Sequence, residues 1–198
     1  MSKVDVKVVL LGKHSVGKTC LVERFLRGKF KENTVATVGA AFGAKKMDVN
    51  GREVTIGVWD TAGQDRYESM SRIYYRSAKA ALVCYDLTDL QSFEKVKLWV
   101  DELQQNEEEC AIYIVGTKSD GVDVGALPRR DMQEYAKQIN GFMFDTSAKS
   151  GDGIEEIFQH IAEAHVNKEQ APSDKSGRIN PGEGRRTKSG GCCGGSAE

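Results

Sequence analysis

Short apolar runs alternate with amphipathic segments along most of the chain, a pattern typical of a sheet covered by helices. The first apolar run, residues 5–11, predicts a buried strand, and residues 19–26 predict a helix that ends at Gly28. Residues 29–43 follow neither the strand nor the helix period. We therefore expect a long loop there, and long loops in compact domains are often functional.

A hairpin is predicted next. Residues 44–49 and 53–60 have strand character and are joined by Asn50-Gly51, a dipeptide that strongly favours a two-residue hairpin turn. This hairpin would add one antiparallel edge strand to an otherwise parallel sheet. Residues 61–79 are polar and mixed, so a mobile segment is expected there.

From residue 80 onward, predicted strands and helices alternate regularly. The strands are 80–86, 111–117 and 142–145, and the helices are 92–105, 130–139 and 154–166. Such alternation is typical of parallel sheets with right-handed crossovers, helices on both faces and ligands at the carboxyl ends of the strands. The expected fold is α/β: a six-stranded, mostly parallel sheet with one antiparallel edge strand.

The composition changes after residue 170. Residues 171–198 are rich in Gly, Ser, Lys and Arg and contain few large apolar residues, so we expect a folded domain at 1–170 and a flexible tail. The net charge of -1 gives no general attraction to nucleic acid, which we do not expect as a partner. Five cysteines, an odd number without metal-ligand spacing to the histidines, favour a reducing, cytosolic compartment.

A phosphate-binding motif follows the first strand. The residues from Val8 to Thr19 are V-V-L-L-G-K-H-S-V-G-K-T, which match G-x-x-x-x-G-K-[ST] between a strand and a helix. Backbone N–H groups and the helix N-terminus favour an anion there, Lys18 would reach the β- and γ-phosphates, and the Thr19 hydroxyl would ligate Mg²⁺. An ordinary glycine-rich turn would rarely have both flanking elements. The candidate residues are Gly12, Ser15, Val16, Gly17, Lys18, Thr19 and Cys20.

Polar residues at three later strand ends indicate what else this site binds. Asp60 ends the third predicted strand and could hold the metal through water, while Gly63 offers an N–H to a γ-phosphate. In Thr117-Lys118-Ser119-Asp120, the carboxylate can accept both N–H groups of a guanine edge, which adenine does not present, and the Lys118 stem can lie on the ring. The backbone of Ser147-Ala148-Lys149 could donate to the guanine carbonyl. Together these strand ends favour guanine.

In their order and spacing, these motifs resemble those of Rab-type small GTPases of the Ras superfamily, from residue 5 to about 168. The shared segments are G-K-H-S-V-G-K-T, T-V-G-A-A-F, W-D-T-A-G-Q-D-R-Y, Y-Y-R-S-A, T-K-S-D and T-S-A-K. The resemblance implies a P-loop NTPase fold and a GTP-hydrolysing switch in vesicle traffic, with GTP or GDP and Mg²⁺ as ligands.

The resemblance also implies roles for single residues. Thr37 would reach Mg²⁺ when the γ-phosphate is present, Phe30 would stack edge-on against guanine, and Gln64 would orient the attacking water. The γ-phosphate would order residues 31–43 and 63–77, and hydrolysis would release them. In addition, three aromatic residues would form a patch that partners recognise, although such residues are more often core. They are Phe42, Trp59 and Tyr74.

Partners and location follow from the same resemblance. Because no residue is recognisable as an internal arginine finger, we expect a GTPase-activating protein to supply one, an effect of about 10³ to 10⁵ in rate. The resemblance also implies further partners: effectors, an exchange factor, and prenylation and GDI-type chaperones. It implies that the chain is a monomer. Cys192-Cys193 would be geranylgeranylated and anchor the chain to the cytoplasmic face of an endomembrane, the alternative being an accidental cysteine pair. The V-G-A-A-F segment resembles that of endosomal members.

Three positions depart from the family pattern. Thr117 stands where an asparagine is usual, and losing its amide would cost about 1 to 3 kcal/mol if nothing replaced it. His14 stands where a small residue is usual, close to the expected place of Gln64, and could slow hydrolysis. Five residues follow Cys193, a longer overhang than usual.

Two other functions remain open. The chain could be a nucleotide-binding docking scaffold that does not hydrolyse, which His14 and Thr117 favour and Gln64 opposes. A phosphoryl-transfer enzyme for a small molecule is disfavoured, because neither a lid segment nor a cluster of substrate-binding arginines is recognisable in the sequence.

Overall fold

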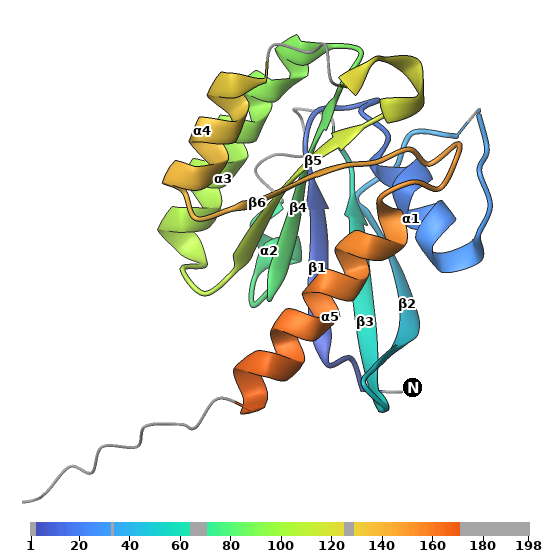
Figure 1. Cartoon of the computed structure of the whole chain (residues 1–198), viewed down its shortest axis with the longest axis vertical. Helices are drawn as coiled ribbons and strands as arrows, with labels where there is room; N and C mark the ends of the chain where they lie inside the picture. Colours follow the sequence, from blue (N-terminus) through green and yellow to red (C-terminus); the bar gives the residue numbers. More distant parts are fainter. Residues whose placement is uncertain (1–2, 33, 64–70, 125–128, 171–198) are drawn as a thin grey trace, which may run out of the picture.

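The computed structural model describes residues 3–32, 34–63, 71–124 and 129–170. Within these ranges, six strands form one sheet in the order β2-β3-β1-β4-β5-β6, with helices on both faces (Figure 1). Only the β2–β3 pair is antiparallel; the other four strand pairs are parallel. The predicted fold class is therefore confirmed.

The bounds of the elements are as follows. The strands are β1 (Val6–Leu11), β2 (Ala40–Val49), β3 (Arg52–Thr61), β4 (Ala80–Asp86), β5 (Ala111–Thr117) and β6 (Phe142–Asp145). The helices are α1 (Lys18–Arg27), α2 (Ser71–Tyr75), α3 (Glu94–Asn106), α4 (Arg130–Gln138) and α5 (Ile154–Gln170). Two 3-10 turns, η2 (Leu90–Phe93) and η3 (Ser119–Gly121), follow β4 and β5.

The sheet separates two hydrophobic cores, because successive side chains of a strand point to opposite faces. Val8 and Leu10 of β1 pack in the core under α1 and α5, whereas Val9 and Leu11 pack in the core under α2, α3 and α4. All four side chains are fully buried. Burial on both faces explains why β1 and β4 have continuous apolar sequences, as expected of parallel strands.

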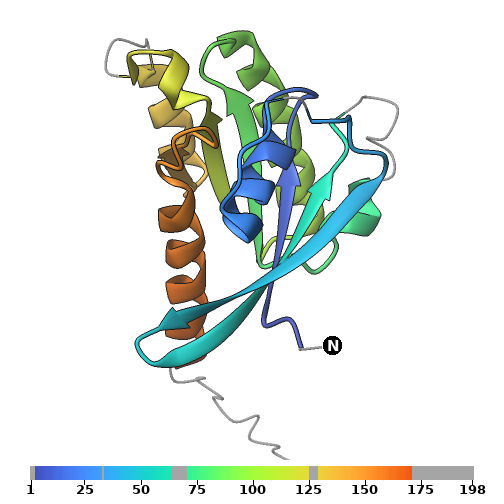
Figure 2. The same cartoon turned by 90° about the vertical axis from the view of Figure 1, so that its right-hand side faces the viewer.

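The predicted hairpin is confirmed at Asn50-Gly51, where both residues have positive φ (53° and 82°), as a type I′ turn requires. Its tip lies beside the end of α5 (Figure 2), where Arg52 forms an ion pair with Glu169. The antiparallel edge strand begins at Ala40, however, not at residue 44. Pairing with β3 extends the strand through Ala40–Gly43, a stretch whose own sequence shows no strand period.

Two further predictions need correction. Part of the segment expected to be mobile forms α2, which is anchored by Tyr75: its side chain is 2% exposed and its hydroxyl donates to Glu102 at 2.6 Å. The helix expected at 92–105 begins as the turn η2 and becomes α-helical only at Glu94. In addition, α5 continues four residues beyond the predicted end. The expected tail, residues 171–198, lies outside the described residues.

None of the described helices is long and apolar enough to cross a bilayer.

Candidate functional site

A pocket of about 620 Å³ opens where the parallel strands end, within the usual range of about 300 to 1,000 Å³ for ligand sites. Most of the residues predicted from the sequence line it: Ser15, Gly17, Lys18, Thr19, Cys20, Phe30, Thr37, Gly63, Thr117, Lys118, Asp120, Ala148 and Lys149. Four others support this lining through hydrogen bonds to its members: Gly12, Val16, Asp60 and Ser147. The structure thus brings together every described residue that we predicted to bind nucleotide or metal.

Lys18 lies at the centre of the phosphate-binding loop. It is 5% exposed, and its Nζ donates to the carbonyls of Gly12 at 2.8 Å and Lys13 at 2.9 Å. Burial lowers its pKa, although the nearby Asp60 carboxylate acts in the opposite direction. Gly63 packs tightly over this ammonium, since a Cβ there would lie 2.3 Å from Lys18 Nζ. Only glycine allows the third strand end to approach the loop so closely.

Three oxygen-bearing side chains meet beside Lys18. The Thr19 and Thr37 hydroxyl oxygens are 2.8 Å apart, and both donate to Asp60 Oδ2, at 2.7 and 3.3 Å. Asp60 is 2% exposed, burial raises its pKa, and its Oδ1 has no hydrogen-bond partner among the described residues. A buried carboxylate oxygen without a partner is costly, and Mg²⁺ prefers ligands of this kind. These residues therefore fit a bound Mg²⁺.

The opposite end of the pocket is formed by two loops that follow β5 and β6. Ser147, which is fully buried, donates from Oγ to Asp120 Oδ1 at 2.5 Å and accepts from the N–H groups of Lys149 at 3.2 Å and Ser150 at 3.1 Å. A further bond, from Ser119 N–H to the Thr146 carbonyl at 3.1 Å, joins the same two loops. The Asp120 carboxylate is thus fixed in place by a neighbouring loop.

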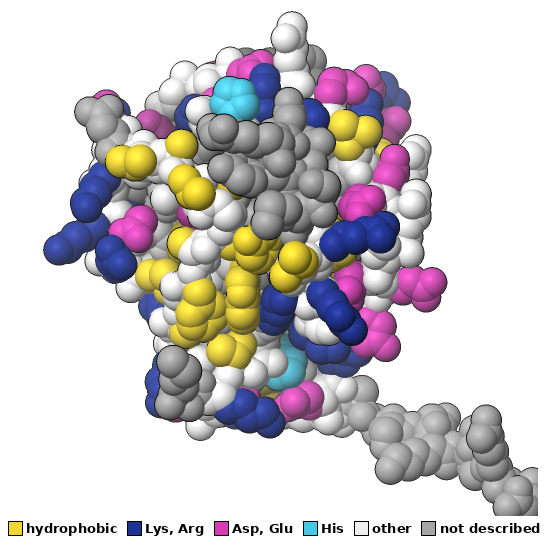
Figure 3. All heavy atoms as spheres, turned by 180° about the vertical axis from the view of Figure 1, so that it is seen from behind, with side chains coloured by type: hydrophobic (Ala, Val, Ile, Leu, Met, Phe, Trp, Pro, Cys, Tyr) yellow, Lys and Arg dark blue, Asp and Glu magenta, His cyan; other side chains and the backbone are white. Residues whose placement is uncertain are grey.

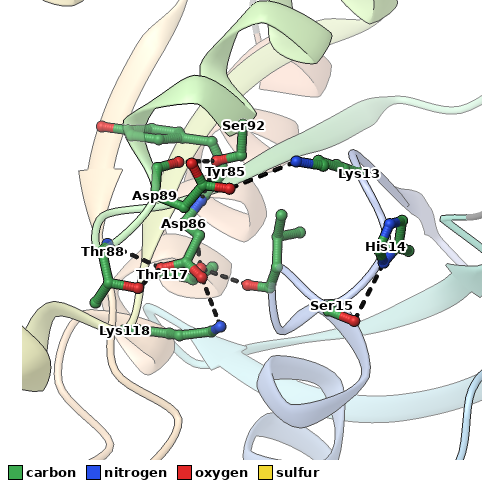
Figure 4. Close-up of polar contacts among 11 residues, drawn as sticks. Lys13, His14, Ser15, Tyr85, Asp86, Thr88, Asp89, Ser92, Thr117 and Lys118 are labelled. Carbon is green, nitrogen blue, oxygen red and sulfur yellow. Dashed lines mark hydrogen bonds and ion pairs between the residues drawn. The ribbon is translucent and has the colours of Figure 1, made fainter.

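Lys118 is held at this end by Asp86, a residue that the sequence reasoning missed. Its Nζ lies 2.5 Å from Asp86 Oδ2, while Thr88 donates to Asp86 Oδ1 from both N–H and hydroxyl (Figure 4). Burial acts to raise the pKa of Asp86, but the bonds from Lys118 and Thr88 outweigh it and lower the pKa. Its position gave a usable signal, because Asp86 ends a buried strand as Thr117 does, and Asp60 lies one residue before such an end.

Thr117 connects this end to the phosphate-binding loop. Its hydroxyl oxygen lies 2.5 Å from the Val16 carbonyl oxygen and 2.9 Å from that of Tyr85, and the residue is 4% exposed (Figure 4). The hydroxyl has a single proton, so it donates a hydrogen bond to only one of these carbonyls at a time. A hydroxyl contact between the two ends of the pocket therefore exists although the usual asparagine is absent.

His14 lies at the mouth of the pocket. Its Nδ1 is 3.3 Å from Ser15 Oγ (Figure 4). A Cβ on Gly63 would lie 2.7 Å from the His14 backbone nitrogen. The neighbouring Lys13 points toward Asp89 and pairs with it at 3.5 Å (Figure 4). Gln64, the predicted catalytic residue, directly follows Gly63 but lies outside the described residues.

The three predicted patch aromatics lie on one side of the sheet. Phe42 is 60% exposed, so it is not a core residue, and its ring centroid lies 4.7 Å from that of Trp59. Trp59 and Tyr74 are half-buried and pack against the core under α3. Hydrophobic side chains gather on the face seen in Figure 3. The predicted lipidation residues, Cys192 and Cys193, lie outside the described residues.

The comparisons with known proteins agree with this geometry. The model of the Ras family matches residues 7–167. Ras-related protein Rab-24 of Dictyostelium discoideum is 44% identical, over 97% of this chain and 98% of that protein. Ras-related protein Rab5A of Oryza sativa subsp. japonica is 38% identical (96% and 95%), and Ras-related protein Rab-21 of Homo sapiens is 37% identical (94% and 90%). The chain therefore belongs to the Ras family and is a Rab-type small GTPase.

Proposed function

We propose that this protein is a GTP-binding and GTP-hydrolysing switch in intracellular membrane traffic, with slow intrinsic hydrolysis. The observation that supports the proposal best is the convergence of Lys18, Thr19, Thr37 and Asp60 at one end of a pocket whose other end contains Asp120. The first end suits a triphosphate with its metal ion, and the second suits the N–H groups of guanine. Both belong to one continuous pocket of nucleotide size.

Different residues of the chain would have different roles in hydrolysis. The ammonium of Lys18 and the loop N–H groups would stabilise charge on the transferring phosphoryl group, and Gln64 would orient the attacking water. Mg²⁺, held by Thr19, Thr37 and Asp60, would neutralise phosphate charge when bound. A partner, a GTPase-activating protein, would supply the arginine that the site lacks among its described residues.

Other partners would use surfaces outside the pocket. Effectors would bind the patch of Phe42, Trp59 and Tyr74, and an exchange factor would promote release of GDP. Two lipid chains on Cys192 and Cys193, with prenylation and GDI-type chaperones, would distribute a monomer between the cytosol and the cytoplasmic face of an endomembrane. An endosomal membrane is the compartment that we propose.

An alternative function, a docking scaffold with little or no hydrolysis, is favoured by His14. His14 lines the pocket, and its backbone nitrogen lies next to Gly63. A smaller residue at position 14 would leave more room for water.

Single-turnover release of phosphate from bound GTP tests the proposal. The wild-type chain should release phosphate slowly, His14→Gly should accelerate release, and Gln64→Leu should slow it. Retention of intact GTP by both the wild type and His14→Gly would favour the scaffold. Binding of ATP in preference to GTP would contradict both functions.

A further inference from the structure

The side chain of Arg24, in the middle of α1, joins this helix to the segment between β6 and α5. Its Nε donates to the Ala148 carbonyl at 2.6 Å, its Nη2 donates to the Lys149 carbonyl, and its Nη1 donates to the Gly28 carbonyl at 3.0 Å. Figure 1 shows the segment after β6 reaching α1 at this point. The planar guanidinium holds two consecutive carbonyls at once, which an ammonium group cannot do with the same geometry.

Holding these carbonyls also fixes the N–H groups behind them. In a trans peptide, the C=O and the following N–H point in opposite directions. The carbonyls of Ala148 and Lys149 face Arg24, so the N–H groups of Lys149 and Ser150 face away from it. Both of these N–H groups donate to Ser147 Oγ, at 3.2 and 3.1 Å.

These two donors determine what the Ser147 hydroxyl can do. With its acceptor positions used by N–H groups, the hydroxyl is left to act as donor, and it donates to Asp120 Oδ1 at 2.5 Å. Ser147 is fully buried, so water does not offer the hydroxyl another arrangement. A continuous set of hydrogen bonds thus leads from Arg24 to Asp120.

We propose that Arg24 is a positioning residue for base selectivity. Through the peptides of residues 148–150 and the Ser147 hydroxyl, it orients the Asp120 carboxylate toward the two N–H groups of guanine. Because α1 also presents Lys18 and Thr19, Arg24 links this orientation to the phosphate end of the pocket. The inference rests on the proposed function, since it takes a guanine nucleotide as the ligand.

Discrimination between GDP and inosine diphosphate (IDP) tests the inference in the full chain. IDP lacks only the 2-amino group, one of the two donors to Asp120, so the ratio of its Kd to that of GDP measures this contact. Both constants can be obtained by competition with a fluorescent GDP analogue in the presence of Mg²⁺. In Arg24→Ala, we expect the ratio to fall about tenfold, the value of one ordinary hydrogen bond. Arg24→Lys, which retains the charge, should retain only part of the preference.

Arg27→Ala is the matched control. Arg27 lies one turn further along α1 and forms an exposed ion pair with Glu23 at 3.1 Å, so its removal should leave the ratio unchanged. Ser147→Ala supplies a second measurement. If Arg24 acts through Ser147, the double variant Arg24→Ala/Ser147→Ala will lose less of the preference for GDP over IDP, in free energy, than the sum of the losses in the two single variants.

Equal weakening of GDP and IDP by Arg24→Ala would overturn the inference, because it would show only a general contribution to the fold. If that variant does not fold, the same ratio in Arg24→Lys decides: an unchanged ratio would overturn the inference. Failure of the proposed function gives a different result, in which the wild-type chain binds no GDP or does not prefer it to ADP.

Discussion

Replacing Thr117 by valine keeps the shape of the side chain and removes only the hydroxyl that connects β5 to the phosphate-binding loop. The carbonyls of Val16 and Tyr85 then lose a donor that lies 2.5 and 2.9 Å away in a buried position. Leaving such an acceptor unsatisfied costs about 1 to 3 kcal/mol. We expect the loop of the free protein to turn the Val16 carbonyl toward water, and bound phosphates to oppose that change. The cost should therefore appear as GDP affinity weakened by about 5- to 150-fold.

Competition with a fluorescent GDP analogue measures this affinity, and the dissociation rate of GDP gives a second measurement. Thr117→Ser is the matched control, because it keeps the hydroxyl and should bind GDP nearly as tightly as the wild type. Serine differs from threonine here only by the missing methyl group, so it can place its hydroxyl at the same two carbonyls. If Thr117→Val and Thr117→Ser have the same affinity and the same dissociation rate, the hydroxyl does not connect the two ends of the pocket.

Three other variants or conditions test single contacts. Gly12→Ala should destabilise the fold in urea by more than Gly28→Ala, which should cost about 1 to 2 kcal/mol for its left-handed φ of 65° alone. At Gly12, with φ of 133°, a Cβ would also lie 2.3 Å from the Cys84 carbonyl oxygen, and such overpacking adds about 1 to 3 kcal/mol. Equal losses of unfolding free energy in the two variants would refute this close contact. Because the folded-state pKa of Asp86 lies below its ordinary value of 3.8, its ion pair stabilises the fold at neutral pH and is lost as the pH falls below that value. Asp86→Asn should thus be less stable than the wild type at pH 7, with a difference that narrows below about pH 4; a difference independent of pH would contradict the assignment. Chelation of Mg²⁺ by EDTA should speed GDP release by more than about tenfold, or about 1.4 kcal/mol, and an unchanged rate would argue against a cation at Asp60.

Strands β4 and β5 could be predicted from sequence to the residue, and β1 and β3 to within one residue at each end, whereas the start of the edge strand β2 could not. β4 and β5 are covered on both faces, so their apolar runs begin and end with the strand itself. β2 instead begins at Ala40 because β3 lies beside it, and its first residues are mostly solvent-exposed. Pairing of this kind depends on the neighbouring strand and leaves no period in the sequence of β2 itself.

The same distinction applies to the site. Lys18, Thr19 and Asp60 could be predicted because each stands in a short motif. One loop or one strand end positions each of them, so the residues that matter are neighbours in the sequence. Arg24 contacts a carbonyl 124 positions away along the chain, and no spacing predicts such a partner. Asp86 lies between these cases: no motif contains it and the sequence reasoning missed it, but its place at a strand end could have marked it as a candidate.

Because β2 lies at the edge of the sheet, its residues affect whether strands of two copies of this protein pair in a concentrated solution. An unpaired strand edge is a template for adding a foreign strand, the first step of edge-to-edge aggregation. Here Lys45 reaches across to Glu155 of α5 at 2.9 Å, and Lys46 pairs with Glu53 at 2.6 Å. A strand added at this edge would have to remove these two ammonium groups from water. The two lysines of β2 therefore oppose the addition of a foreign strand at this edge.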